Sequence, residues 1–139
     1  NMCHSYINAA KLLGFHLRIA CPEGYEPSPS VLAAAGDAVT IESDPKVAVA
    51  GAHLLVTDVW ASMGQEAEAS ERNNALQAYQ LNRELLNLAD DEAIYLHCLP
   101  AHRGEEITAD LMDDPNSVIW EGAENRLHAQ KALVDCLLS

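Results

Sequence analysis

The chain has 139 residues, a length that fits one domain and lets folding bury roughly two-thirds of the surface that the unfolded chain exposes. Its formal charge of −13, from 21 acidic and 8 basic residues, would repel a phosphate backbone and argues against a nucleic-acid partner. The four cysteines show no CxxC spacing, so we expect reduced thiols. The sequence has no apolar run near the ~20 residues of a membrane span and no signal-peptide pattern. We therefore expect a cytoplasmic protein with no membrane partner.

The first third of the chain alternates between helical and strand-like patterns. Apolar residues recur at helical spacing over 2–13, and a glycine follows as a stop signal. We expect a strand over 16–20, a short alanine-rich helix that ends at Gly36, and a β-branched strand over 39–41.

The rest of the chain continues this alternation. Asp44 followed by Pro45 predicts the start of a helix, because aspartate is a good N-cap and proline suits the first helical position. The apolar run 54–56 stops abruptly and predicts a parallel strand that helices cover on both sides. Four further elements are expected: a long helix with Ala78, Leu81, Leu85 and Leu88 on one face, strands over 93–97 and 118–120, and a helix over 123–138. Together the pattern predicts one α/β domain over 1–139, with an open, mostly parallel, Rossmann-like sheet and helices on both faces.

Two polar segments begin where an apolar strand stops, which is where ligands bind in open parallel sheets. One runs from Asp58 to Gly64, and the other runs from His97 to Glu106. The carboxylate of Asp58 suits a substrate ammonium group, and the loop behind it offers a hydroxyl and backbone N–H donors for a substrate carboxylate. Taken alone, an aspartate after a strand is more often a helix or turn cap.

Cys98 lies between His97 and the dipeptide Leu99-Pro100, where a neighbouring imidazole or a bound cation could ionise its thiol. Adjacent strand residues point to opposite faces, so a buried thiol beside a hydrogen-bonded histidine is the plainer interpretation. The Leu99-Pro100 bond at this corner could be cis. We expect no metal ligands among five histidines that have no partner at metal-ligand spacing: His4, His16, His53, His102 and His128.

The segments 58–64 and 97–106, in this order, resemble the two signature loops of the ornithine carbamoyltransferases. The resemblance extends over nearly all of the chain through four more stretches: Asn1, His4-Ser5, 24–27 and 123–126. It implies an ornithine-binding domain of a transferase that needs neither a metal nor an organic cofactor. The reaction implied is transfer of the carbamoyl group of carbamoyl phosphate to the side-chain amine of L-ornithine, which gives citrulline and phosphate.

The resemblance also implies roles for individual residues. Asp58 and Ser62 would hold the α-amino group of ornithine, while Asn1 and the backbone of Met63 would hold its α-carboxylate. These contacts would orient the substrate through charge and hydrogen bonding.

Catalysis and the second substrate are assigned in the same way. Cys98 would lie beside the attacking amine, so Cys98 and Asp58 are the catalytic candidates. Cys98, Leu99 and Arg126 would approach carbamoyl phosphate, where a guanidinium can pair with oxygens as charge moves toward the leaving phosphate.

Compared with the family's pattern, we expect this sequence to lack the carbamoyl-phosphate domain, with its Ser-Thr-Arg-Thr-Arg phosphate loop, and the first strand of the present domain. We therefore expect the isolated chain to be inactive and to bind ornithine weakly, because several phosphate contacts worth about 1.5–3 kcal/mol each are missing. A full-length parent would form a homotrimer or a larger oligomer. Three alternatives stay open: a transcarbamylase for a related amine such as putrescine, a non-catalytic amino-acid-binding module, and a thiol hydrolase that uses Cys98 and His97.

Overall fold

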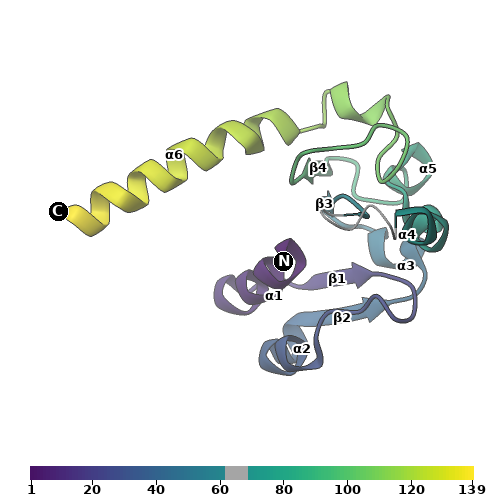
Figure 1. Cartoon of the computed structure of the whole chain (residues 1–139), viewed down its shortest axis with the longest axis horizontal. Helices are drawn as coiled ribbons and strands as arrows, with labels where there is room; N and C mark the ends of the chain where they lie inside the picture. The colour runs from purple at the N-terminus through teal and green to yellow at the C-terminus, as the bar shows by residue number, and fades with distance from the viewer. Residues whose placement is uncertain (62–68) are drawn as a thin grey trace.

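Short parallel strands form the centre of the computed structural model, which describes residues 1–61 and 69–139 (Figure 1). The strands are β1 (Leu17–Ala20), β2 (Val39–Glu42), β3 (Leu54–Thr57) and β4 (Ile94–His97). The helices are α1 (Met2–Leu13), α2 (Pro29–Ala35), α3 (Pro45–Val49), α4 (Ala69–Leu76), α5 (Arg83–Leu86) and α6 (Ile119–Leu138). The residues that the structure describes also form the 3₁₀ turns η1 (Gly36–Ala38), η3 (Gln77–Tyr79) and η4 (Leu111–Asp113).

The strands pair in parallel as β1 with β2 and β3 with β4. The predicted α/β class with parallel strands is confirmed, but in the described residues the strands form two separate two-stranded sheets. Arg18 on β1 donates to the carbonyls of Val47 and Ala50 at the end of α3, at 3.2 and 2.8 Å. Because strand residues alternate, Leu17 and Ile19 point to the opposite face of this sheet.

Several element boundaries follow from their local sequence. The carboxylate of Asp44 accepts a hydrogen bond from the backbone N–H of Lys46 at 2.8 Å, and Pro45 occupies the first turn, so α3 begins as predicted. Helix α1 ends at Gly14, whose φ of 75° is a left-handed conformation that glycine adopts without strain.

The main core lies beneath β3 and β4. Tyr95 is fully buried on β4, and its hydroxyl donates to the carbonyl oxygen of Leu111 at 2.6 Å. Burial also raises the pKa of this hydroxyl to about 12, so it stays protonated and keeps donating. The buried residues around it are Leu55, Leu81, Leu86, Ala93, Ile107, Leu111, Met112 and Ile119.

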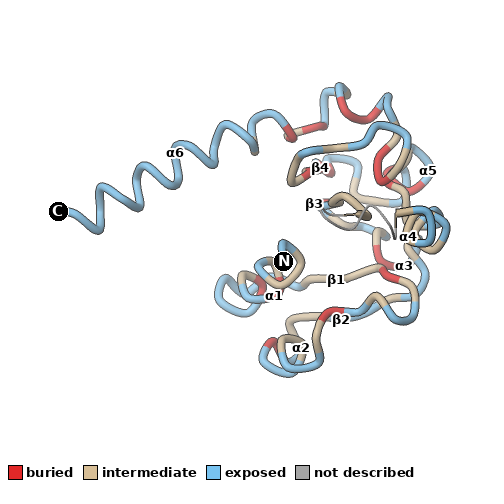
Figure 2. The backbone as a smooth tube through the Cα atoms, in the orientation of Figure 1, coloured by how far each residue is buried: buried red, intermediate tan, exposed pale blue. Residues whose placement is uncertain are grey.

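Helix α6 extends away from the rest of the molecule to the C-terminus (Figure 1), and Figure 2 shows it as exposed beyond its first turn. Its start lies against β4, where a Cβ added at Gly122 would come within 2.8 Å of Leu96 Cδ2. A larger residue at this position would therefore require the end of the Leu96 side chain to move. Farther along, large apolar side chains are exposed: Leu127, Leu133, Val134, Leu137 and Leu138.

Two predictions from the sequence are wrong. Residues 118–120 do not form a strand, because Ile119 begins α6 and only an isolated bridge between Tyr95 and Ser117 extends the sheet. The long helix predicted around 78–88 is interrupted, since the side chain of Asn82 accepts from the N–H of Leu85 and begins the separate helix α5.

No helix among the described residues is long and apolar enough to cross a membrane.

Candidate functional site

Asp58 and Cys98 lie side by side at one edge of the β3–β4 sheet. The register pairs Thr57 with His97, the last residues of the two parallel strands, so the next residue of each strand emerges at the same carboxyl edge. Both side chains are half-buried. The two segments that the sequence singles out therefore begin next to each other.

The charges around Cys98 identify its neighbours. Burial and, to a smaller extent, the negative charge of Asp58 raise the pKa of the Cys98 thiol to about 11, while the Arg126 guanidinium and the amino terminus at Asn1 act in the opposite direction. Three charged groups from distant parts of the chain thus act electrostatically on Cys98. At neutral pH the thiol of Cys98 is protonated.

Tyr6 belongs to the same neighbourhood, although the sequence analysis did not single it out. Burial raises the pKa of its hydroxyl, and negative charges on Cys98 and Asp58 raise it further. Tyr6 stands on α1, the helix for which Asn1 is the N-cap residue. The sequence signal that could have indicated Tyr6 is its place on the same helix as Asn1, because this helix brings both residues toward the sheet edge.

His97 is buried and both of its ring nitrogens are engaged. Nδ1 accepts a hydrogen bond from the backbone N–H of Leu99 at 2.9 Å, so the proton of the neutral ring lies on Nε2. Nε2 donates to Oε1 of the fully buried Glu106 at 2.8 Å. Since neither nitrogen is free to take a proton from Cys98, this geometry argues against a cysteine–histidine hydrolase.

Glu106 hydrogen-bonds to two parts of the loop that follows β4, at His97 and at His102. Its Oε1 also accepts from the backbone N–H of His102 at 2.7 Å. Burial alone would raise the pKa of this carboxyl, but hydrogen bonds from His97 and from the backbone N–H groups of His102 and Glu106 outweigh burial and lower it. The carboxylate is therefore ionised and shapes the loop that carries Cys98 and Leu99.

Leu99 has an uncommon backbone conformation. Its φ is 45°, in the left-handed region, and the Leu99–Pro100 peptide is cis, as the sequence allowed. Because its N–H is bound to His97, the polar backbone group that Leu99 can offer a ligand is its carbonyl oxygen.

The remaining predicted site residues differ in their surroundings. Asn1 is exposed at the start of α1 and makes no capping hydrogen bond through its side chain. Arg126 is exposed on α6. Ser62 and Met63 lie outside the described residues. The carboxylate of Asp58 accepts from the N–H of the adjacent Val59 at 2.9 Å.

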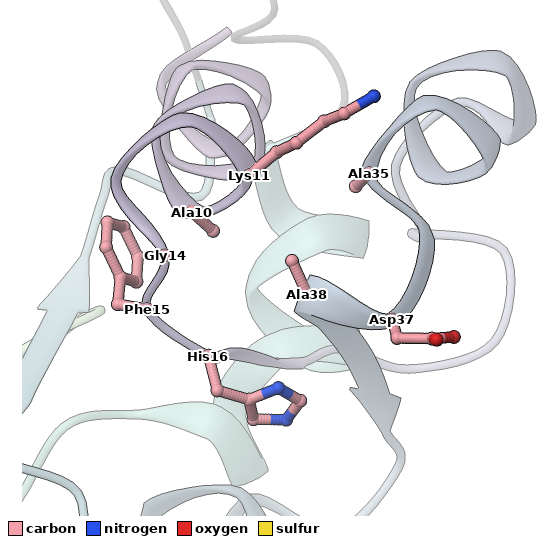
Figure 3. Close-up of a pocket in the computed structure, with 8 residues that line it drawn as sticks. All are labelled: Ala10, Lys11, Gly14, Phe15, His16, Ala35, Asp37 and Ala38. Carbon is pink, nitrogen blue, oxygen red and sulfur yellow. The ribbon is translucent and has the colours of Figure 1, made fainter.

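A surface hollow at the end of α1 is a separate feature (Figure 3). Its polar side chains point apart: Lys11 donates to the carbonyl of Ala34, and His16 hydrogen-bonds to Thr40 Oγ1 at 2.6 Å. It contains none of the predicted site residues, and its polar groups do not converge on one position.

Comparison with known proteins decides the family. The family model for the aspartate/ornithine carbamoyltransferase Asp/Orn binding domain matches residues 1–137. The chain belongs to this family. The resemblance carried by the two signature loops is therefore confirmed.

Relatives within the aspartate/ornithine carbamoyltransferase family are similar over the whole chain. The ornithine carbamoyltransferase of Pseudomonas syringae is 60% identical over 139 residues, and the anabolic enzyme of Pseudomonas aeruginosa is 59% identical over 138 residues, or 99% of this chain. The chain spans 45% of the length of each. It therefore corresponds to less than half of these relatives.

Solved structures agree with this assignment. The anabolic ornithine carbamoyltransferase of Campylobacter jejuni superposes with a TM-score of 0.91 at 34% identity, covering 99% of this chain and 48% of that one. The Pyrococcus furiosus ornithine carbamoyltransferase gives a TM-score of 0.85 at 48% identity, covering 94% and 44%. The fold is thus the one that these enzymes share.

Proposed function

We propose that this chain is the ornithine-binding part of an ornithine carbamoyltransferase, which transfers the carbamoyl group of carbamoyl phosphate to the side-chain amine of L-ornithine. The observation that carries the proposal is the pairing of Thr57 with His97, because it brings Asp58 and Cys98 to the same sheet edge. The names of the similar proteins favour ornithine as the substrate, and those from Pseudomonas aeruginosa and Campylobacter jejuni are described as anabolic, which favours citrulline formation.

The acceptor substrate binds through opposite charges. Asp58 and Ser62 hold the α-amino group of ornithine, while Asn1 and the backbone of Met63 hold the α-carboxylate. Ornithine carries two ammonium groups at neutral pH, and the chain's charge of −13 favours the approach of such a ligand. Tyr6 lies near enough to Cys98 and Asp58 to form one wall of this position.

Cys98 contacts the side-chain amine of ornithine as a neutral thiol. Its pKa of about 11 means that it does not hold a thiolate ready to take a proton from the substrate. An incoming ammonium would favour the thiolate by Coulomb attraction, so Cys98 and the amine share a proton more readily once the substrate is bound. We assign Cys98 the role of orienting the amine as it loses its proton.

Carbamoyl phosphate approaches from the side of Leu99 and Arg126. The carbonyl of Leu99 can accept a hydrogen bond from the carbamoyl NH₂ group, since its own N–H is bound to His97. The Arg126 guanidinium pairs with phosphate oxygens as the C–O bond to phosphate breaks. The ornithine nitrogen forms the new C–N bond, and of the two protons it loses, one goes to the departing phosphate and one to solvent.

The chain alone holds too little of the phosphate site for turnover. Arg126 is exposed on a projecting helix, and one exposed guanidinium offers a weak grip on a phosphate. We therefore propose that activity needs the remaining half of the longer protein, and that ornithine binds weakly to the chain alone.

The test is a chimera in which this chain replaces the matching 138-residue segment of the Pseudomonas aeruginosa enzyme. Citrulline formation is measured with carbamoyl phosphate and, in separate assays, ornithine, putrescine, aspartate or N-acetylornithine. We expect a strong preference for ornithine in kcat/KM. A folded chimera that prefers another acceptor contradicts the assigned substrate, and one with no activity toward any of them contradicts the assigned reaction.

Matched variants of the chimera test the assigned site. Asp58→Asn removes one charge at nearly constant shape, whereas Asp37→Asn makes the same change in the separate hollow at the end of α1. We expect the first variant to raise KM for ornithine at least ~10-fold, the typical loss of a charged contact. The second variant should match the parent chimera, and an equal effect of both would contradict the assignment of Asp58.

A further inference from the structure

Three side chains that can bind metals meet on the loop after β4. The ring nitrogen Nδ1 of His102 lies 3.7 Å from Oε2 of Glu105 and 3.9 Å from Oε2 of Glu106. All three ligand atoms lie within 4.8 Å of one another. His102 and Glu105 are about half exposed, whereas the side chain of Glu106 is fully buried.

The buried carboxylate separates this group from an ordinary acidic surface cluster. Oε1 of Glu106 accepts hydrogen bonds from His97 and from the backbone of His102, but Oε2 is buried and has no hydrogen-bond partner among the described residues. An ionised carboxylate oxygen without a partner is costly to bury. This oxygen faces the two exposed members of the cluster.

We propose that His102, Glu105 and Glu106 bind a divalent first-row metal ion. Such ions bind nitrogen and oxygen ligands at about 2.0 to 2.2 Å, which sets neighbouring ligand atoms about 3.0 to 3.4 Å apart. The separations of 3.7 and 3.9 Å therefore need to shrink by about 0.3 to 0.9 Å, and the third separation, which is at most 4.8 Å, by up to about 1.8 Å. The two exposed side chains can make this movement, and solvent completes the coordination.

The surroundings of the cluster support its role as a site. The metal-bound carboxylate of Glu106 would itself be hydrogen-bonded by His97, which is the usual second layer of contacts behind a metal ligand. The side chain of Gln80 donates to the carbonyls of Gly104 and Glu105 at 2.9 and 2.6 Å and fixes the turn that carries Glu105. The nearby cation Arg103 is paired with Asp113, at 2.9 Å, and does not neutralise the cluster.

The site would act on the loop that holds the proposed substrate contacts. Glu106 already joins His97 to the backbone of His102, and His97 holds the N–H of Leu99. A cation on Oε2 would link Glu105 and His102 to the same carboxylate and stiffen this loop. We infer a structural ion, since the cluster uses Oε2 of Glu106 whereas His97 binds Oε1.

Manganese(II) is the suitable probe, because carboxylates bind it well while the free cysteines of the chain would compete for zinc. Binding to the 139-residue chain is followed by loss of the six-line electron paramagnetic resonance signal of free Mn²⁺. Thermal unfolding with and without Mn²⁺ gives a second measurement. We expect one cation per chain and a higher Tm in its presence.

Variants of the exposed ligands decide whether the cluster is the site. His102→Ala and Glu105→Gln should each weaken Mn²⁺ binding at least ~10-fold and remove the rise in Tm. The matched control is His128→Ala, which removes an exposed histidine that lies 3.4 Å from Glu124 on α6. The proposal is overturned if Mn²⁺ does not bind, or if it binds equally well to the parent chain and to both ligand variants.

Discussion

The thiol of Cys98 should be less reactive at neutral pH than an ordinary cysteine. Burial and the charge of Asp58 raise its pKa from an ordinary 9.0 to about 11. Replacing Asp58 with asparagine removes the negative charge and should lower this pKa. Replacing Arg126 with glutamine removes a positive charge and should raise it.

The size of the effect on reactivity follows from the fraction of thiolate. At pH 8 about one in ten thiols with a pKa of 9.0 is ionised, whereas a pKa of about 11 leaves about one in a thousand. A thiolate of higher pKa is intrinsically more nucleophilic, by roughly eightfold over this interval. The net expectation is that Cys98 reacts about tenfold more slowly than a small cysteine peptide.

The assay uses a chain in which Cys98 is the only cysteine and an aromatic disulfide reagent that releases a coloured thiolate. Rates are measured from pH 7 to about 12.5, so that both sides of the midpoint are sampled. Limited access lowers every rate equally and leaves the midpoint unchanged. A midpoint near 11 that moves down in Asp58→Asn and up in Arg126→Gln supports the arrangement. A midpoint near 9 that neither variant moves would refute it.

Three further predictions concern the packing beneath the site. Tyr95→Phe removes the shorter of two hydrogen bonds to the carbonyl of Leu111, which also accepts from the N–H of Asp114 at 3.4 Å, and should lower the free energy of unfolding by about 0.5–1.5 kcal/mol, measured by urea denaturation. Glu106→Leu leaves the donors of His97 and His102 unpaired and should lower the free energy of unfolding by about 2–5 kcal/mol, measured in the same way. Glu106→Gln retains an acceptor and should lower it by less. Equal losses in the two variants would show that these hydrogen bonds contribute little to stability. Folding lowers the pKa of Glu106, so the ionised carboxylate stabilises the folded chain at pH values above the unfolded pKa. This stabilisation is lost as the pH falls through the lower, folded pKa. Acid should therefore destabilise the parent chain more than the Glu106→Gln variant.

Local sequence signals predicted much of the fold. The helix over Met2–Leu13, the capped start at Asp44 and the strands before Asp58 and Cys98 all follow from periodicity and from capping residues. The strand expected over 118–120 is wrong, because its β-rich composition resembles a strand although only Ser117 bridges the sheet. Such short apolar segments are decided by tertiary contacts rather than by propensity.

The candidate site was predictable where strand ends determine it. Asp58 and Cys98 follow apolar strands, and parallel pairing brings the ends of such strands to one edge. The contribution of Tyr6 depends on how α1 approaches the sheet, and local spacing does not specify that approach. The cluster around His102 was missed because a turn, rather than a helical or CxxC spacing, brings its members together.

The central claim is that Asp58 and Cys98 contact one ornithine molecule, and a double-mutant cycle in the chimera tests it most directly. Steady-state kcat/KM for ornithine is measured for the parent chimera, Asp58→Asn, Cys98→Ser and the double variant. If both residues contact the same substrate, each single change should lower kcat/KM at least ~10-fold, and the double variant should lose clearly less than the product of the two losses. Losses that multiply without coupling, or an unchanged kcat/KM in either single variant, would contradict the shared site.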